Sequence, residues 1–174
     1  MNEWLVLLKN VDTKPFLQCI KLIKHYKNDI DDINLSTRGE KSIQYSFPVE
    51  GIMMSKLSNL FIDYIKKIDG INTVDLFQES AWQVDGEKGS YHRMHNHAGK
   101  SPRGLSCVLY LDVPDNKDRA EFYYLLRRDD ETICDSIFPE KGDLIIMSKT
   151  VYHGVYPQTS DGLRRTLNID FKID

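Results

Sequence analysis

The sequence predicts a mostly β protein with flanking helices, folded as a double-stranded β-helix (jelly-roll barrel) with two N-terminal helices packed outside it. From residue 72 onward, roughly eight short runs rich in Val, Ile, Tyr, Phe and Leu recur between turn-forming residues. Before residue 72, two segments show helical periodicity instead. At 174 residues we expect a single domain, in which residues 1–71 form a helical N-terminal support and residues 72–174 form the barrel core.

The N-terminal support begins with alternating apolar residues, which predict a strand, and continues with two amphipathic patterns, which predict helices. Thr13 precedes the first helical pattern, Pro15 suits its first turn, and Gly70 follows the second pattern. The expected elements are a strand within residues 1–12, a helix over 14–27 capped by Thr13, a polar turn over 36–40, and a helix over 53–68 ended by Gly70.

The barrel core alternates strand-forming runs with turns. Turn-forming residues separate neighbouring runs at 85–86, 98–104 and 114–116. The expected strands cover residues 73–84, 90–97, 105–113, 120–126, 132–138, 143–147, 151–155 and 165–173.

Composition excludes several classes of function. A net charge of −3 gives no reason to expect nucleic acid or an anionic membrane as partner. The three cysteines are scattered and form no CxxC pair, so neither a thiolate zinc site nor a disulfide framework is indicated. No signal peptide or bilayer-spanning run is apparent, and we expect a cytoplasmic location.

Three of the five histidines fall within six positions, in the segment from Tyr91 to His97. On an extended strand, His95 and His97 point to the same face. Two imidazoles on one face can bind one metal ion, and iron, zinc, copper and nickel all accept imidazole ligands. The natural third ligand is His153, from another strand. The alternative is a polar strand end with solvated histidines.

The same alternation assigns the remaining side chains of this region. Tyr91 and Arg93 share the face of the histidine pair and are candidates for a substrate pocket or a barrel-edge contact. His92 has the opposite parity, so we expect it at the surface or behind the ligands. Trp82 is assigned to the core, and His25 to the exposed face of the first helix.

The order of these motifs resembles that of the iron(II)- and 2-oxoglutarate-dependent oxygenases, in particular the small prolyl-hydroxylase-like group of bacteria and phages. The resemblance covers about residues 78–172. His153 and Arg164 lie 11 residues apart, a spacing typical of that family. The matching motifs are Trp82, His95-x-His97, the strand 106–111, Pro139-x-x-Gly142-Asp143, His153-Gly154-Val155 and Arg164-x-Thr166.

The resemblance implies that His95, His97 and His153 hold Fe(II) and that 2-oxoglutarate binds beside them as cosubstrate. Arginine suits the distal carboxylate of 2-oxoglutarate because its planar guanidinium can form bidentate hydrogen bonds. Arg164 and Thr166 share a strand face, so we prefer Arg164 and keep Arg165 as the alternative if a bulge shifts the register.

Tyr110 or Ser106 would add a hydroxyl to the cosubstrate site. The implied reaction converts 2-oxoglutarate to succinate and carbon dioxide while hydroxylating a protein side chain or a small molecule.

One position departs from the family pattern. The usual motif is His-x-Asp or His-x-Glu, and here His97 occupies the carboxylate position. His97 completes a three-histidine site, or stands back and leaves that position to water or an anion, or marks a protein that has lost catalysis. Asp112 and Asp115 follow nearby, but the resemblance does not place them at the metal.

Two other classes compete with the oxygenase reading. A cupin-type metal-binding barrel enzyme is favoured by Gly89, six residues before His95, but residues 98–104 lack the expected glutamate. The second cupin motif also has a histidine very soon after a Pro-x-Gly turn, whereas here His153 follows Gly142 only after an intervening strand. The third class is a non-catalytic barrel that binds a protein or a sugar.

Overall fold

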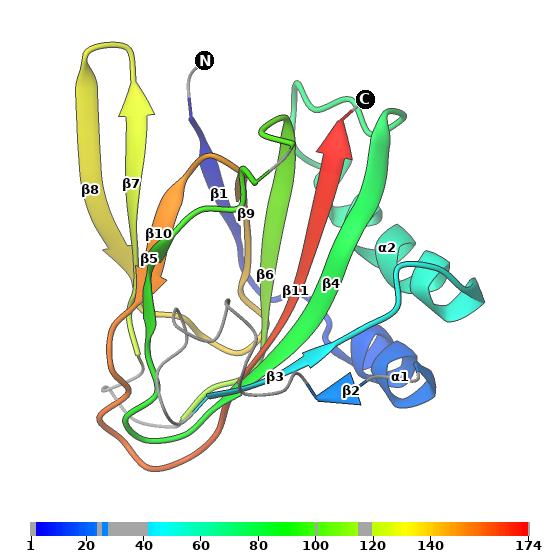
Figure 1. Cartoon of the computed structure of the whole chain (residues 1–174), viewed down its shortest axis with the longest axis horizontal. Coiled ribbons are helices and arrows are strands. Elements are labelled where there is room, and N and C mark those ends of the chain that lie inside the picture. The colour runs from blue at the N-terminus through cyan, green and yellow to red at the C-terminus, as the bar shows by residue number, and fades with distance from the viewer. Residues whose placement is uncertain (1–2, 24–25, 28–41, 100, 115–119, 174) are drawn as a thin grey trace.

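The structure, a computed structural model, describes residues 3–23, 26–27, 42–99, 101–114 and 120–173. In these residues two antiparallel sheets face each other, and two helices cover the outer face of the larger sheet (Figure 1). The seven-stranded sheet has the order β1-β9-β6-β11-β4-β3-β2, and the four-stranded sheet has the order β5-β10-β7-β8. This architecture confirms the predicted jelly-roll class.

The larger sheet contains β1 (Leu5–Leu8), β2 (Tyr26–Lys27), β3 (Ser42–Ser46), β4 (Leu76–Gly86), β6 (Gly104–Asp112), β9 (Leu144–Ser148) and β11 (Arg164–Ile173). The smaller sheet contains β5 (His92–His95), β7 (Phe122–Arg128), β8 (Glu131–Ile137) and β10 (Tyr152–Val155). Strands β4 to β11 correspond to the eight runs expected after residue 72. Strands β2 and β3 were not expected; both extend the edge of the sheet beyond β4, and such long-range pairing leaves little mark on local sequence.

The two helices are α1 (Lys14–Leu22) and α2 (Ile52–Ile65). Helix α1 is shorter than predicted, because Tyr26–Lys27 pairs with β3 instead of continuing the helix. The side chain of Thr13 makes no capping hydrogen bond; the Asp12 carboxylate instead accepts one from the Lys14 N–H, at 3.0 Å. A turn follows α2 as far as Gly70, which has a φ of 83°. The predicted turn over 36–40 and His25 lie outside the described residues.

Side chains alternate between the two faces of the central strands β6 and β11, one face towards the helices and the other towards the smaller sheet. Apart from Arg165, their odd-numbered residues pack under the helices in the main core, together with Phe16, Leu57 and Phe61. On β11 the even-numbered residues from 164 to 170 line the space towards the smaller sheet, and they are polar: Arg164, Thr166, Asn168 and Asp170. A buried row of polar side chains therefore lines the space between the sheets.

Apolar residues fill the other part of this space. They form a second cluster, which includes Phe122 of β7, Met147 of β9 and Val155 of β10. This packing holds the two sheets apart at a fixed distance next to the polar row. Among the described residues, no helix combines the length and apolar character needed to cross a membrane.

Candidate metal centre

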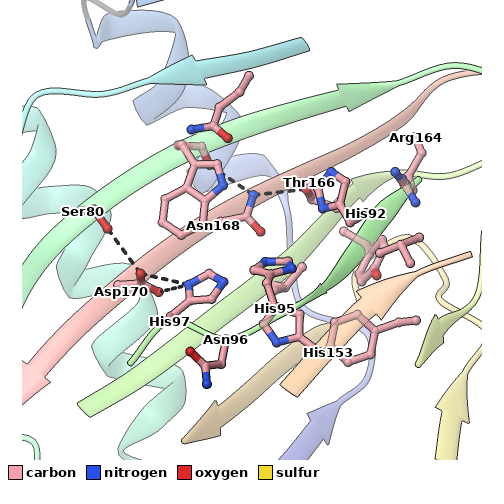
Figure 2. Close-up of a pocket in the computed structure, with 16 residues that line it drawn as sticks. Ser80, His92, His95, Asn96, His97, His153, Arg164, Thr166, Asn168 and Asp170 are labelled. Atoms are coloured by element: carbon pink, nitrogen blue, oxygen red, sulfur yellow. Dashed lines mark hydrogen bonds and ion pairs between the residues drawn. The ribbon is translucent and has the colours of Figure 1, made fainter. Parts of the chain in front are cut away.

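Three histidine side chains meet between the sheets (Figure 2). His95 lies at the end of β5 and is paired with His153 of β10 across the small sheet. His97 lies just beyond β5, where its backbone N–H donates to the Lys149 carbonyl at 2.9 Å. The ring centroids are 4.5 to 5.2 Å apart, and one nitrogen from each ring lies within 4.8 Å of the others. The arrangement could hold one metal ion.

The path of the chain to this cluster differs from the predicted strand. Strand β5 ends at His95, and its register with β10 shifts, because His153 pairs with His95 whereas Val155 pairs with His92. The extra residue on β5 is a bulge, which breaks the strict alternation of side chains. Consequently His92 lines the pocket, and the expectation that it points away is wrong.

The bulge also changes the residues at the rim. Arg93 is exposed and does not line the pocket, and neither does Tyr91, so their predicted inward orientation is wrong. Asn96 lines the pocket in their place.

Each of the three rings has its Nδ1 atom next to an oxygen acceptor. Nδ1 of His95 donates to the Arg93 carbonyl at 2.7 Å, and Nδ1 of His153 donates to the Val151 carbonyl at 3.1 Å. Nδ1 of His97 lies 2.9 and 3.0 Å from the two oxygens of the Asp170 carboxylate. Because these acceptors carry no proton, each ring holds its own proton on Nδ1 and offers the Nε2 lone pair as a metal ligand.

Burial favours the neutral form of the His95 and His153 rings. It lowers the pKa of His95 and holds the pKa of His153 well below its usual range, and in each case the neighbouring His97 acts in the same direction. Nε2 of His97 is buried and has no hydrogen-bond partner among the described residues. A buried ring nitrogen with no hydrogen-bond partner is suited to a metal ion.

His97 is held from several sides. Trp82 stacks on its ring, with centroids 5.4 Å apart, so this tryptophan lines the pocket and is not a core residue as predicted. The Ser106 hydroxyl lies 3.2 Å from Nδ1 of His97. Ser106 is not among the residues that line the pocket, so the structure places it behind His97 and not at the predicted cosubstrate position.

The adjacent arginines have opposite surroundings. Arg164 is 3% exposed and lines the pocket, and its Nη1 has no hydrogen-bond partner among the described residues. Arg165 points out of the pocket, where its guanidinium donates two 2.8 Å hydrogen bonds to Asp85. Of the two arginines considered, Arg164 therefore faces the histidines' pocket.

Gly86 leaves room for the Arg164 side chain. A Cβ atom at Gly86 would lie 2.5 Å from the Ser90 hydroxyl and 3.0 Å from Nη2 of Arg164. The Tyr110 hydroxyl belongs to the same end of the pocket; burial raises its pKa, and the charge of Arg164 lowers it in part. Burial also lowers the pKa of Arg164.

Both sheets contribute to one pocket of about 330 Å³. It combines the three histidines with the buried Arg164, whose Nη1 has no partner among the described residues, so it suits an anion that chelates a metal and carries a second negative group. Its remaining lining residues are Gln44, Ser80, Trp82, His92, Asn96, Val108, Tyr110, Phe122, Val155, Thr166, Asn168 and Asp170.

Sequence reasoning missed Asn168 and Asp170. Continuing the alternation that placed Arg164 and Thr166 on one face reaches both of them. Asn168 lies between Thr166 and Asp170 in this row, and its side chain donates to the Thr166 hydroxyl at 3.1 Å and to the Trp82 carbonyl at 3.3 Å.

No protein-family model matches the sequence, and no curated protein is significantly similar to it. Solved structures are similar in fold. An oxidoreductase of the 2OG-Fe(II) oxygenase family from Burkholderia pseudomallei has a TM-score of 0.68 at 13% identity, and the match covers 97% of this chain and 85% of that one. A prolyl-4-hydroxylase from Pseudomonas putida has a TM-score of 0.66 at 17% identity, covering 98% and 92%.

HygX from Streptomyces hygroscopicus, with nickel, 2-oxoglutarate and hygromycin B bound, has a TM-score of 0.67 at 10% identity, covering 97% of this chain and 82% of that one. The described chain thus has the fold of the 2-oxoglutarate- and iron(II)-dependent oxygenases.

Proposed function

We propose that this protein is an Fe(II)- and 2-oxoglutarate-dependent dioxygenase that hydroxylates a protein side chain or a small molecule. One observation carries the proposal: three convergent histidines line the same pocket as a buried arginine, Arg164, whose Nη1 has no hydrogen-bond partner among the described residues. In this proposal His95, His97 and His153 hold the iron. When bound, iron and 2-oxoglutarate supply the oxidising chemistry, with dioxygen consumed and succinate and carbon dioxide released.

Arg164 binds the distal carboxylate of 2-oxoglutarate. A buried guanidinium is unfavourable unless it is paired, and Nη1 of Arg164 has no hydrogen-bond partner among the described residues, while burial lowers the pKa of the side chain. A carboxylate of 2-oxoglutarate bound there would offset this cost. The hydroxyls of Thr166 and Tyr110 lie in the same pocket and complete the carboxylate site as hydrogen-bond donors. These contacts set the orientation of the cosubstrate relative to the histidines.

The pocket walls exclude water from the reacting atoms. Trp82 stacks on His97 and Phe122 stacks on His153, with a ring separation of 5.3 Å for the second pair. These contacts restrict ring rotation and cover one side of each ligand. Among the structures similar in fold, one is a prolyl-4-hydroxylase and another has hygromycin B bound, which is why both protein and small-molecule substrates are included.

The buried arginine is the feature that favours this function over a cupin. A cupin site assigns no role to Arg164, whereas a 2-oxoglutarate site requires a cation at such a position. A non-catalytic barrel likewise gives no reason to keep a buried guanidinium in the same pocket as three convergent imidazoles.

Cosubstrate binding and turnover test the proposal. We expect 2-oxoglutarate to bind the nickel-loaded protein in calorimetry and to bind far more weakly without metal. With iron(II), dioxygen and 2-oxoglutarate, we expect slow succinate release even when no substrate for hydroxylation is added. This release should stop when 2-oxoglutarate is left out. Metal-independent binding, or no binding and no succinate, would refute the proposal.

A further inference from the structure

We propose that Asp170 is a positioning residue that supplies, from behind His97, the negative charge that the metal site lacks among its ligands. The inference rests on the proposed metal site. It assigns to Asp170 the orientation of the His97 ring, the proton on Nδ1, and the charge balance of the loaded pocket.

The geometry of the contact supports this role. Both oxygens of Asp170 lie within 3.0 Å of Nδ1 of His97, and the two side chains are each 9% exposed. A carboxylate only accepts hydrogen bonds, so it forces the ring proton onto Nδ1 and the lone pair onto Nε2. The Ser80 hydroxyl donates to the far oxygen of Asp170 at 3.3 Å and fixes the carboxylate in turn.

His97 differs from the other two histidines in the charge of its acceptor. Nδ1 of His95 and of His153 donates to a neutral backbone carbonyl. Nδ1 of His97 donates to an anion, which raises the electron density on its ring and strengthens Nε2 as an electron donor to a metal ion. The position where the family usually has an anionic ligand therefore holds the one histidine of the three that is hydrogen-bonded to a carboxylate.

Charge balance leads to the same residue. Among the described residues, the Asp170 carboxylate bonds only to His97 and Ser80, with no lysine or arginine beside it. Such a buried anion is costly unless a cation lies near it. With iron(II) and 2-oxoglutarate bound, the two charges of the metal and that of Arg164 balance the two carboxylates of 2-oxoglutarate and Asp170.

Substitution of Asp170 tests the charge directly. We expect D170N, in the full chain, to weaken cobalt(II) and anaerobic iron(II) binding by about 10- to 100-fold, and to change the visible spectrum of the cobalt(II) form. The matched control is D85N, which removes a carboxylate from β4 of the same sheet that bonds to Arg165 and not to a histidine. D85N should bind both metals as the wild type does.

A double substitution separates positioning from a merely structural role. In H97D, the new carboxylate lies beside Asp170, so the pocket holds two neighbouring anions and the metal-free protein should lose stability. Adding D170N to H97D should restore that stability, and it should weaken metal binding by a smaller factor than D170N does in the wild type, because a carboxylate ligand at position 97 needs no partner for a ring proton. Asp170 is therefore expected to help metal binding more when position 97 is histidine than when it is aspartate.

The outcomes are distinguishable from failure of the proposed function. If H95A and H153A lose the metal while D170N binds it as tightly as the wild type, the metal site stands and the role of Asp170 is refuted. The same role is refuted if D170N weakens binding equally in the wild-type and H97D backgrounds. If the wild type binds neither cobalt(II) nor iron(II), the metal site and this inference both fail.

Discussion

Replacing Arg164 by methionine should separate cosubstrate binding from folding. Methionine keeps much of the volume of the side chain but removes its charge. Because the guanidinium is buried and partly unpaired, its removal should leave the stability of the metal-free protein unchanged or slightly higher. Binding of 2-oxoglutarate should suffer instead, since one of its carboxylates would then be buried without a partner.

The size of the effect follows from the burial of Arg164. Breaking a buried ion pair by removing one partner costs about 3–5 kcal/mol. At about 1.4 kcal/mol for each tenfold change, the dissociation constant of 2-oxoglutarate should rise roughly 100- to 5,000-fold. The dissociation constant for Arg164→Lys should lie between those of the wild type and R164M, because lysine keeps the charge but not the bidentate geometry.

The matched control is Arg165→Met. Arg165 forms a partly exposed pair with Asp85, so its loss should cost at most about 1 kcal/mol of stability and should not alter cosubstrate binding. Calorimetry of 2-oxoglutarate binding to the nickel-loaded proteins and thermal denaturation of the metal-free proteins measure the two effects. Unchanged binding in R164M, or an equal loss in R165M, would refute the assignment of Arg164.

Three further predictions concern the same pocket. His95→Ala or His153→Ala should reduce the metal content of the purified protein from near one equivalent to near none, and an unchanged stoichiometry would show that these rings are not ligands. Gly86→Ala should cost about 1–3 kcal/mol of stability by overpacking, and it should weaken 2-oxoglutarate binding, because the new methyl group meets Ser90 and Arg164; normal binding would show that this recess does not position the arginine. The metal-free protein should lose stability as the pH falls from about 7 to 5. Burial holds the pKa of His95 and His153 below the ordinary 6.5, so the unfolded chain binds more protons than the folded protein in this range. The free energy of unfolding should therefore fall by up to about 1.4 kcal/mol per histidine for each pH unit. A denaturation temperature that does not change with pH over this range would contradict that reasoning.

The alternation of side chains along two strands shows which site residues could be predicted from the sequence alone. Arg164 and Thr166 were placed on one face because side chains alternate along any strand, and the structure puts both in the pocket. The same rule failed between Tyr91 and His97, where a bulge against β10 turns His92 inward. Alternation is reliable only while pairing is regular, and nothing in the local residues marks the bulge.

The sequence by itself determined the fold class, the eight strands after residue 72, the histidines that meet in the pocket and the face of β11 that carries Arg164. These features depend on local geometry: strand alternation, turn chemistry and the spacing of residues along the chain. Only the tertiary structure decided that Asp170 lies behind His97, that Ser106 lies beside the same ring, and that Trp82 covers it. Asp170 on β11 and His97 just beyond β5 are 73 residues apart in the chain, so their contact depends on how the strands are ordered and aligned across two sheets, which no local pattern encodes.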